Sequence, residues 1–167
     1  MLPASVWAQT DCDLDPAIVD AVDQMQQSHQ EFSYSGTFLK ESSGSRNFIE
    51  KSHRAGDERG QLDYVNASET EESQAVWAPR GPRMSACELG KLYAFHLERG
   101  PKVAGRDSVL LHLRPRDGLR LGYRLALDDA SGLILKSESF SEDGTLLERH
   151  EYASLTVTPK DENSEAE

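Results

Sequence analysis

Residues 120–155, RLGYRLALDDASGLILKSESFSEDGTLLERHEYASL, contain three segments typical of β-strands. The first alternates between two faces, whereas the other two carry apolar residues on both sides. Two short turns with Asp and Gly separate the three segments, and turns this short connect neighbouring strands that run in opposite directions. The expected strands are 120–127, 133–140 and 145–155. This part of the chain therefore predicts an antiparallel meander.

The same signals continue toward the N-terminus, where Gly-containing turns again separate short apolar segments. Further strands are expected at 32–40, 46–53, 61–65, 76–77, 84–88, 91–97 and 107–114. Several of the expected strands carry apolar residues on both faces, so both faces of the sheet need a cover. One helix can cover one face. Curling of the sheet or a bound ligand must cover the other.

One helix is expected, from residue 16 to residue 28 or 29. Asp15 can cap it, and the proline that follows suits the first helical position. Ile18, Val22 and Met25 recur at helical spacing and form an inward-facing stripe. The fold class is therefore α+β, with an antiparallel sheet packed on one main N-terminal helix. The predicted core between the sheet and the helix consists of Val22, Met25, Phe38, Leu111, Tyr123, Leu125 and Leu135.

Composition and the absence of known motifs argue against several classes of function. The chain has 167 residues, a length typical of one domain, and its net charge of -11 argues against nucleic-acid binding. No window is long and apolar enough to predict a membrane-spanning helix. Motifs for serine hydrolases, phosphate-binding loops, zinc proteases and dinucleotide binding are missing, and the five histidines do not have ligand spacing. We therefore expect no catalytic residues, no cofactor and no metal, so a small hydrolase has no positive support.

Two cysteines, Cys12 and Cys87, could form a disulfide in an exported protein or remain two buried thiols. A bridge would join the leading segment to a central strand and contribute up to roughly 4 kcal/mol. Residues 1–10 are expected to be the remnant of a secretory signal peptide or a disordered leader. The domain then spans 11–158, and 159–167 form an acidic disordered tail.

Charge is distributed unevenly. From Pro79 to Arg124 there are ten basic and four acidic residues, although the whole chain is acidic. Guanidinium groups suit phosphates and carboxylates, so this segment could bind an anionic head group or an acidic protein segment. The alternative is a strand face exposed to solvent. The candidate ligand-binding residues are Arg106, Arg114, Arg120, Arg124, Tyr34, Phe38 and Tyr123.

These motifs together resemble the large N-terminal domain of the MucB/RseB family, periplasmic regulators of the envelope-stress sigma factor. The first is the junction of the helix, Val22-Asp-Gln-Met25, with the segment Phe32-Ser-Tyr34-Ser-Gly36-Thr37-Phe38, and the second is Ser52-His53-Arg54. The third is a series comprising Val103-Ala-Gly-Arg106, Leu113-Arg-Pro-Arg-Asp117, Gly122-Tyr123-Arg124, Leu127-Asp128, Ser131-Gly132-Leu133, Leu135-Lys136-Ser137-Glu138, Asp143-Gly144 and Leu147-Glu148. The resemblance covers about two thirds of the chain.

The resemblance implies a strongly curved antiparallel sheet, an unclosed barrel like those of the lipoprotein carriers LolA and LolB, with a hollow for an acyl chain. It also implies a periplasmic location in a Gram-negative bacterium. Two family features are missing here. Only residues 98–102 replace a helical insertion, and the second domain that holds the anti-sigma factor is not part of this sequence.

Two functional hypotheses follow. In the first, the chain is a non-enzymatic MucB/RseB-like module that binds a lipid, lipopolysaccharide or lipoprotein acyl chain and modulates the periplasmic domain of an anti-sigma factor. In the second, it is a LolA/LolB-type carrier of lipids or lipoproteins without a link to sigma regulation. Neither involves nucleic acid.

Overall fold

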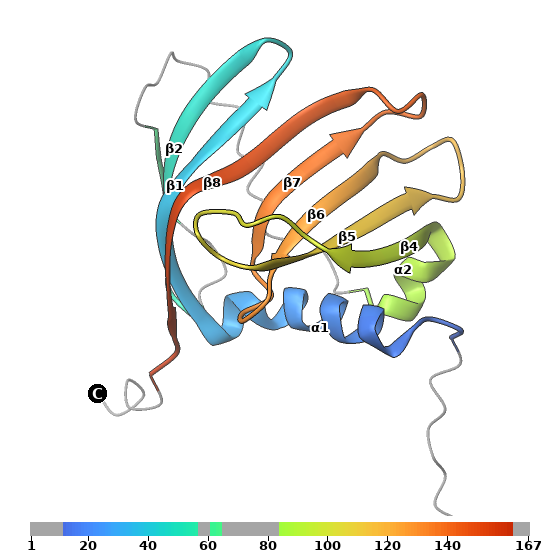
Figure 1. Ribbon diagram of the computed structural model, residues 1–167, viewed down its shortest axis with the longest axis horizontal. Coiled ribbons are helices and arrows are strands. Elements are labelled where there is room, and N and C mark those ends of the chain that lie inside the picture. The colour runs from blue at the N-terminus through green and yellow to red at the C-terminus, as the bar shows by residue number, and fades with distance from the viewer. Residues whose placement is uncertain (1–11, 57–60, 65–83, 162–167) are drawn as a thin grey trace, which may run out of the picture.

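One eight-stranded antiparallel sheet forms the body of the molecule, in the order β3-β2-β1-β8-β7-β6-β5-β4. The computed structural model describes residues 12–56, 61–64 and 84–161. The strands are β1 (Phe32–Ser42), β2 (Ser45–His53), β3 (Gln61–Tyr64), β4 (Tyr93–Arg99), β5 (Ser108–Pro115), β6 (Gly122–Asp128), β7 (Ile134–Phe140) and β8 (Leu146–Pro159). The sheet curves strongly, and its outermost strands β3 and β4 do not pair, so the barrel is unclosed (Figure 1). The predicted α+β fold, with a strongly curved unclosed sheet on one main N-terminal helix, is confirmed.

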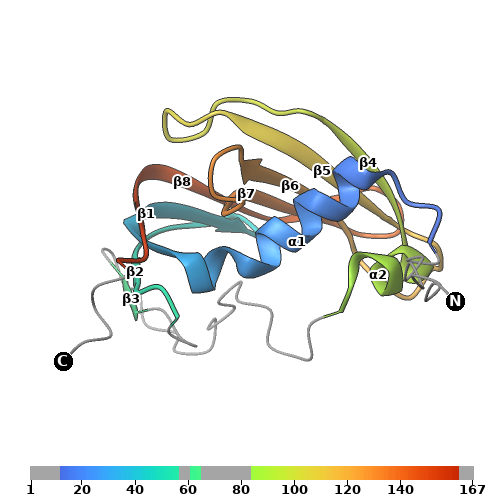
Figure 2. The same ribbon diagram turned by 90° about the horizontal axis from the view of Figure 1, so that it is seen from below.

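The main helix, α1 (Pro16–Glu31), crosses the concave side of the sheet, which arches over it (Figure 2). The Asp15 carboxylate accepts a hydrogen bond from the Ala17 N–H at 2.9 Å, as expected of an N-cap. The helix runs to Glu31, slightly beyond the expected end, and passes into β1 with no intervening loop. No helix within residues 12–56 and 84–161 is long and apolar enough to cross a membrane.

A second helix, α2 (Ala86–Leu92), replaces the strand predicted at 84–88, and that prediction is wrong. The reason is a capping box: Ser85 Oγ accepts from the Glu88 N–H at 3.2 Å, and the Glu88 carboxylate accepts from the Ser85 N–H at 2.9 Å. Because α2 continues to Leu92, the next strand begins at Tyr93 rather than at residue 91. The helical start signal, Ser-x-x-Glu, is present in the sequence.

Cys12 and Cys87 form a disulfide with a Cα–Cα distance of 5.5 Å. It joins the segment before α1 to helix α2, so Cys87 lies on a helix and not on the central strand expected from sequence. The bridge therefore ties the two helices together at one end of the concave face.

The main core lies between α1, α2 and strands β5 and β6. Its buried members are Ile18, Val22, Ala86, Leu111, Leu125 and Leu127, with Met25 and Tyr123 packed against them. Leu111 is 0% exposed, and full burial of a leucine contributes about 2 kcal/mol. Of the seven residues predicted for this core, five lie in it.

The other two, Leu135 and Phe38, lie elsewhere. Leu135 belongs to a second cluster with Val103 and Ala126, because the register between β6 and β7 shifts after Ala126 and strict alternation fails there. Phe38 packs against His150 and Tyr152 of β8 instead of α1. The alternation of side chains along a single strand does not reveal this bulge between β6 and β7.

Three sequence predictions concern the chain ends and the region between β3 and α2. The expected leader 1–10 and the expected strand 76–77 lie outside the described residues. The tail expected at 159–167 begins too early, because Pro159 pairs with Phe32 in the sheet and the Lys160 N–H donates to the Glu31 carbonyl at 2.7 Å.

Candidate ligand-binding site

A pocket opens beside the C-terminal end of α1, against strands β1, β2, β7 and β8. We call it the aromatic pocket. Its cavity volume is about 50 Å³, within a hollow of about 600 Å³ that includes open solvent. Its lining residues are His29, Tyr34, Phe38, Lys51, Leu133, Ile134, Leu135, Lys136, Ser137, His150, Glu151, Tyr152 and Leu155.

Strand pairing places the aromatic wall of this pocket. Tyr34 and Phe38 project from the same face of β1, since they are four positions apart. Phe38 lies 5.6 Å from Tyr152 between ring centroids, in an edge-to-face arrangement. Between them in β1 stands Gly36, whose backbone passes so close to β8 that a Cβ there would lie 2.1 Å from the Ser154 carbonyl oxygen. A glycine is therefore required at this position, where β1 and β8 approach too closely for a Cβ to fit.

Polar groups at one end of the pocket form a compact network. The Tyr34 hydroxyl and His29 Nδ1 are 3.1 Å apart, and the rings of Tyr34 and His53 stack at 4.9 Å. His53 Nε2 donates to the His29 carbonyl at 2.8 Å, which joins β2 to the end of α1. Burial raises the pKa of Tyr34 and of Tyr152, so both hydroxyls stay protonated and neutral at physiological pH.

Two lysines, Lys40 of β1 and Lys51 of β2, lie on the same face of the sheet as Tyr34. Each is only 9% exposed. Lys40 Nζ lies 3.3 Å from Glu148, which also lies 3.2 Å from His150 Nε2. Within the described part of the chain Lys51 has no ion pair, and its Nζ sits 5.4 Å from the centre of the Tyr34 ring. Burial lowers the pKa of Lys51 to about 8.

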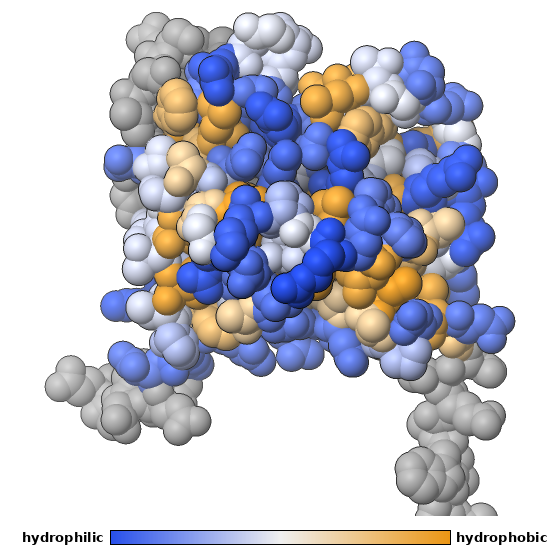
Figure 3. Space-filling model, viewed as in Figure 1, coloured by the Kyte–Doolittle hydropathy of each residue, from blue (hydrophilic) through white to orange (hydrophobic). Residues whose placement is uncertain are grey.

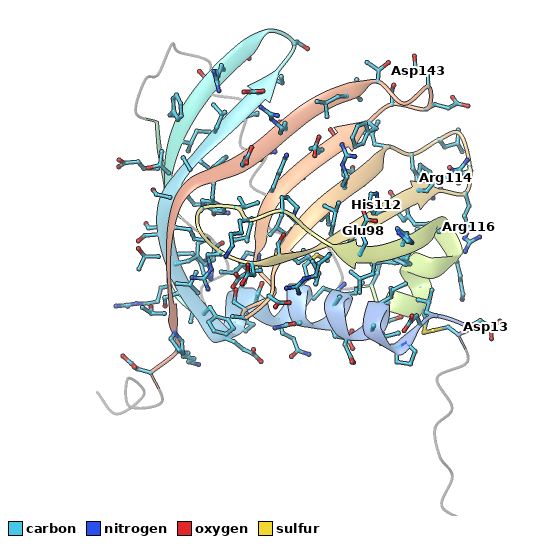
Figure 4. All side chains as sticks on the ribbon, viewed as in Figure 1. Asp13, Glu98, His112, Arg114, Arg116 and Asp143 are labelled. Atoms are coloured by element: carbon cyan, nitrogen blue, oxygen red, sulfur yellow. A yellow bond between two sulfur atoms is a disulfide. The ribbon has the colours of Figure 1, made fainter. Side chains whose placement is uncertain are left out.

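A second hollow, which we call the arginine cleft, lies between the β5–β6 turn and the β7–β8 turn. It holds about 1060 Å³ of space, part of it open solvent. Its lining includes Arg114, Arg116, Arg120, Arg124 and Tyr123, and also Asp117, Phe140 and Glu142. Figure 4 shows Arg114 and Arg116 at the β5–β6 end of the sheet, with Asp143 at the neighbouring turn.

Most of the cleft's guanidinium groups already have partners. Arg120 pairs with Asp117, and Arg116 Nε donates to the Gly90 carbonyl at 2.9 Å. Arg124 makes two hydrogen bonds to Glu138, at 3.3 and 3.1 Å. Arg114 has no ion pair or side-chain hydrogen bond within the described residues, so it is the arginine of the cleft most able to take a new anion.

Arg124 belongs to a row of alternating charges across the convex face of the sheet. In this row Arg46 and Arg149 both pair with Glu41, at 3.2 and 2.9 Å, and Arg124 pairs with Glu138. Register places Arg149 opposite both Glu41 and Glu138. Figure 3 shows hydrophilic residues across the middle of this face. The row explains part of the arginine content without a ligand.

The candidate residues named from sequence therefore separate into three groups. Tyr34 and Phe38 line the aromatic pocket, while Arg114, Arg120, Arg124 and Tyr123 line the arginine cleft. Arg106 lines neither, because it pairs with Asp128.

Sequence reasoning missed Lys51, His150 and Tyr152. The alternation of Ile49, Lys51 and His53 on one face of β2 was the available signal, since a lysine between two inward-facing residues must itself point inward. No cluster within residues 12–56 and 84–161 could hold a metal ion.

Comparisons with known proteins agree with this architecture. The MucB/RseB N-terminal domain family matches residues 63–167. The sigma factor AlgU regulatory protein MucB of Pseudomonas aeruginosa is 29% identical over 160 residues, covering 83% of this chain and 50% of that protein. The chain thus spans about half the length of this curated relative.

Two solved structures are also similar. A crystal structure of MucB superposes with a TM-score of 0.76 at 26% identity, over 92% of this chain and 63% of that one. The complex structure of Pseudomonas aeruginosa MucA/MucB gives a TM-score of 0.72 at 26% identity, over 90% and 60%. Because the family match covers more than half of the residues and the fold agrees, this chain belongs to the MucB/RseB N-terminal domain family.

Proposed function

We propose that this chain is a non-enzymatic regulatory module of the periplasm. It binds the acyl chain of a lipid, lipopolysaccharide or lipoprotein and acts on the periplasmic domain of an anti-sigma factor. The observation that carries the proposal is the aromatic pocket, an apolar hollow on a protein of a regulatory family. The relative MucB is described as a regulatory protein of the sigma factor AlgU, and a structure of MucB with MucA exists.

The lining of the aromatic pocket supports acyl binding. Leu135 and Leu155 contribute aliphatic surface, and Phe38 and Tyr152 contribute aromatic faces. An acyl chain gains about 0.8 kcal/mol for each methylene removed from water, so a chain of moderate length binds without any polar contact. The shape and the apolar walls suit a single flexible chain better than a rigid polar metabolite.

The arginine cleft is the proposed contact for an anion outside the pocket. Arg114, Arg120 and Arg124 give it a positive balance on a protein of net charge -11. An acidic segment of the anti-sigma factor or an anionic lipid head group would be attracted to it. Arg114 would contribute most, because the other two must leave existing carboxylate partners.

The disulfide between Cys12 and Cys87 supports a periplasmic location. Disulfides form and persist in oxidising compartments such as the bacterial periplasm.

A fluorescence titration with the neutral probe N-phenyl-1-naphthylamine tests acyl binding. The probe should bind the purified chain, and lipid vesicles or free acyl compounds should displace it. Phe38→Ala should weaken probe binding by about tenfold or more, through loss of apolar contact. Leu146→Ala, at a side chain that is 45% exposed, is the matched control and should leave binding unchanged. Absence of probe binding would refute the acyl-binding half of the proposal.

Calorimetry with the periplasmic domain of the anti-sigma factor from the same organism tests the regulatory half. Arg114→Glu should weaken binding and reduce its salt dependence. Arg99→Glu, outside the cleft, is the control. No binding by the unmodified chain, together with rapid transfer of lipid from donor to acceptor vesicles, would favour a LolA/LolB-type carrier instead.

A further inference from the structure

Lys51 is a buried cation that has no counter-charge among the described residues. Its side chain projects inward from β2 into the aromatic pocket, and it is 9% exposed. The nearby Lys40 is equally buried but has Glu148 at 3.3 Å. Charged residues are almost never this buried unless they are paired, so the unpaired state of Lys51 calls for an explanation.

The protein itself offers Lys51 little compensation. The face of the Tyr34 ring lies 5.4 Å from Nζ, which gives a weak cation–π interaction. The nearest charged groups on this side are Lys40, whose positive charge repels a charged Lys51, and Glu148, which pairs with Lys40 and also contacts His150. Burial lowers the pKa of His150, which favours its neutral form. The described residues of the pocket lining also include Tyr34, Tyr152, His29, Lys136 and Glu151, and His53 lies next to His29. Lys136 pairs with Glu138 at 3.6 Å, and Glu151 forms no ion pair with Lys51. Among the described residues, Lys51 is therefore the lysine of this pocket that has no carboxylate partner.

An apolar hollow with one unpaired cation matches a ligand with an apolar tail and one negative charge. We infer that the aromatic pocket takes a single-chain carboxylate amphiphile, such as a long-chain fatty acid, whose carboxylate pairs with Lys51 Nζ. The tail then lies against Phe38, Tyr152 and Leu155. This inference rests on the proposed acyl-binding function and specifies its ligand class.

The orientation differs from the one expected from sequence, in which the head group stays outside beside arginines. A carboxylate near Lys51 is shielded from water, where charge pairing is strongest. It also restores the charged form of Lys51, so binding should be accompanied by proton uptake near pH 8, the pKa to which burial lowers this lysine. The arginine cleft is then free to contact a protein partner.

The test is displacement of N-phenyl-1-naphthylamine from the full chain by laurate and by dodecan-1-ol, both below their aggregation concentrations. The two compounds have the same chain length and differ in charge. At pH 7 laurate should displace the probe at a concentration about 30-fold lower than dodecan-1-ol. In Lys51→Met the advantage of laurate should disappear, while displacement by dodecan-1-ol should be unchanged or improved.

Two further variants separate the alternatives. Lys51→Arg keeps the charge and should retain most of the preference for laurate. Arg114→Gln removes the free arginine of the cleft and should not alter that preference. If Arg114→Gln abolishes the preference and Lys51→Met does not, the head group lies at the cleft and the inference is overturned.

Failure of the inference and failure of the proposed function give different results. If both compounds displace the probe equally from the unmodified chain, the pocket binds acyl chains but Lys51 does not select a carboxylate. If neither compound displaces the probe, or the probe does not bind, acyl binding itself is refuted and the inference with it.

Discussion

Arg106 holds the carboxylate of Asp128 with two hydrogen bonds, from Nε to Oδ1 at 2.8 Å and from Nη2 to Oδ2 at 2.9 Å. Asp128 ends β6, and its Oδ2 also accepts from the backbone N–H and the hydroxyl of Ser131. Burial alone would raise the pKa of Asp128, but these hydrogen bonds outweigh it and the pKa is lowered. The pair therefore fixes the β6–β7 turn to the segment that precedes β5.

Replacing this arginine should reduce stability without affecting ligand binding. Arg106→Gln leaves the Asp128 carboxylate, whose side chain is 2% exposed, without its cation, and we expect a loss of about 2–4 kcal/mol in urea unfolding. Arg99→Gln, which breaks a 3.8 Å pair between exposed side chains, should change the free energy of unfolding by less than about 0.5 kcal/mol. A variant of Arg106 that folds with unchanged stability but no longer binds the apolar probe would contradict the structural role.

Gly36→Ala should be poorly tolerated. The new methyl group would meet the Ser154 carbonyl oxygen at 2.1 Å, and neither backbone can yield without breaking the pairing of β1 with β8. We expect a loss of roughly 3 kcal/mol or failure to fold. Ser35→Ala, at the adjacent exposed position, is the control. Thermal unfolding followed by circular dichroism measures both, and equal midpoints would show that the strands can separate at this point.

Reduction of the disulfide should lower stability substantially. The bond between Cys12 and Cys87 closes a loop of 75 residues, which corresponds to roughly 4 kcal/mol in the chain-entropy model. The double variant Cys12→Ser, Cys87→Ser should match the reduced protein and should not respond to dithiothreitol. Its thermal midpoint should fall by more than 5 °C, on the order of 2–4 °C per kcal/mol for a chain of this size. An unchanged midpoint would mean that the packing of the two helices already fixes this end of the fold.

Lys51→Met should make the ligand-free protein more stable at neutral pH. The pKa of Lys51 is lowered in the folded state to about 8, whereas in the unfolded chain a lysine titrates near 10.4. Below pH 8 both states are protonated and the folded state carries the full cost of the buried charge, roughly 3 kcal/mol. Between pH 8 and pH 10 the unfolded state binds the extra proton, so stability should rise with pH.

The measurement is the difference in unfolding free energy between the unmodified chain and Lys51→Met at a series of pH values. The gap should be largest at pH 7 and should close toward pH 10. Lys91→Met, at an exposed position of α2, should show no such trend. A gap that stays constant with pH would show that Lys51 is not deprotonated in this window.

The sequence was sufficient for the overall architecture and insufficient for pairings across the sheet. Alternation and turn residues identified most strands, because both depend on local chemistry. Leu135 was misplaced because a bulge depends on how two strands meet, which no single segment encodes. The helix that replaces the strand predicted at 84–88 is different, because its start signal, Ser85 and Glu88, is local and present in the sequence.

For the candidate site too, local motifs could be predicted from the sequence, whereas contacts between strands could not. Tyr34 and Phe38 could be named from a motif in one strand. The arginines could not be sorted from sequence, because their carboxylate partners stand on other strands: Arg124 pairs with a residue 14 positions away and Arg106 with one 22 positions away. Lys51 becomes notable only when its neighbours are known, since what distinguishes it is the lack of a counter-charge among residues 12–56, 61–64 and 84–161.

The strand order has a kinetic consequence. Strand β1 has β2 on one side and β8 on the other, so residues 32–42 and 146–159 must meet before the two halves of the sheet can join. Contacts this far apart in the chain are slow to form, because the loop between them must be closed first. Until residues 146–159 have been synthesised, the edge of β1 that later pairs with β8 stays unpaired. Until that edge is paired, its open backbone groups can pair with another copy of the chain, so the strand order makes the unfinished β1 edge the site at risk of aggregation.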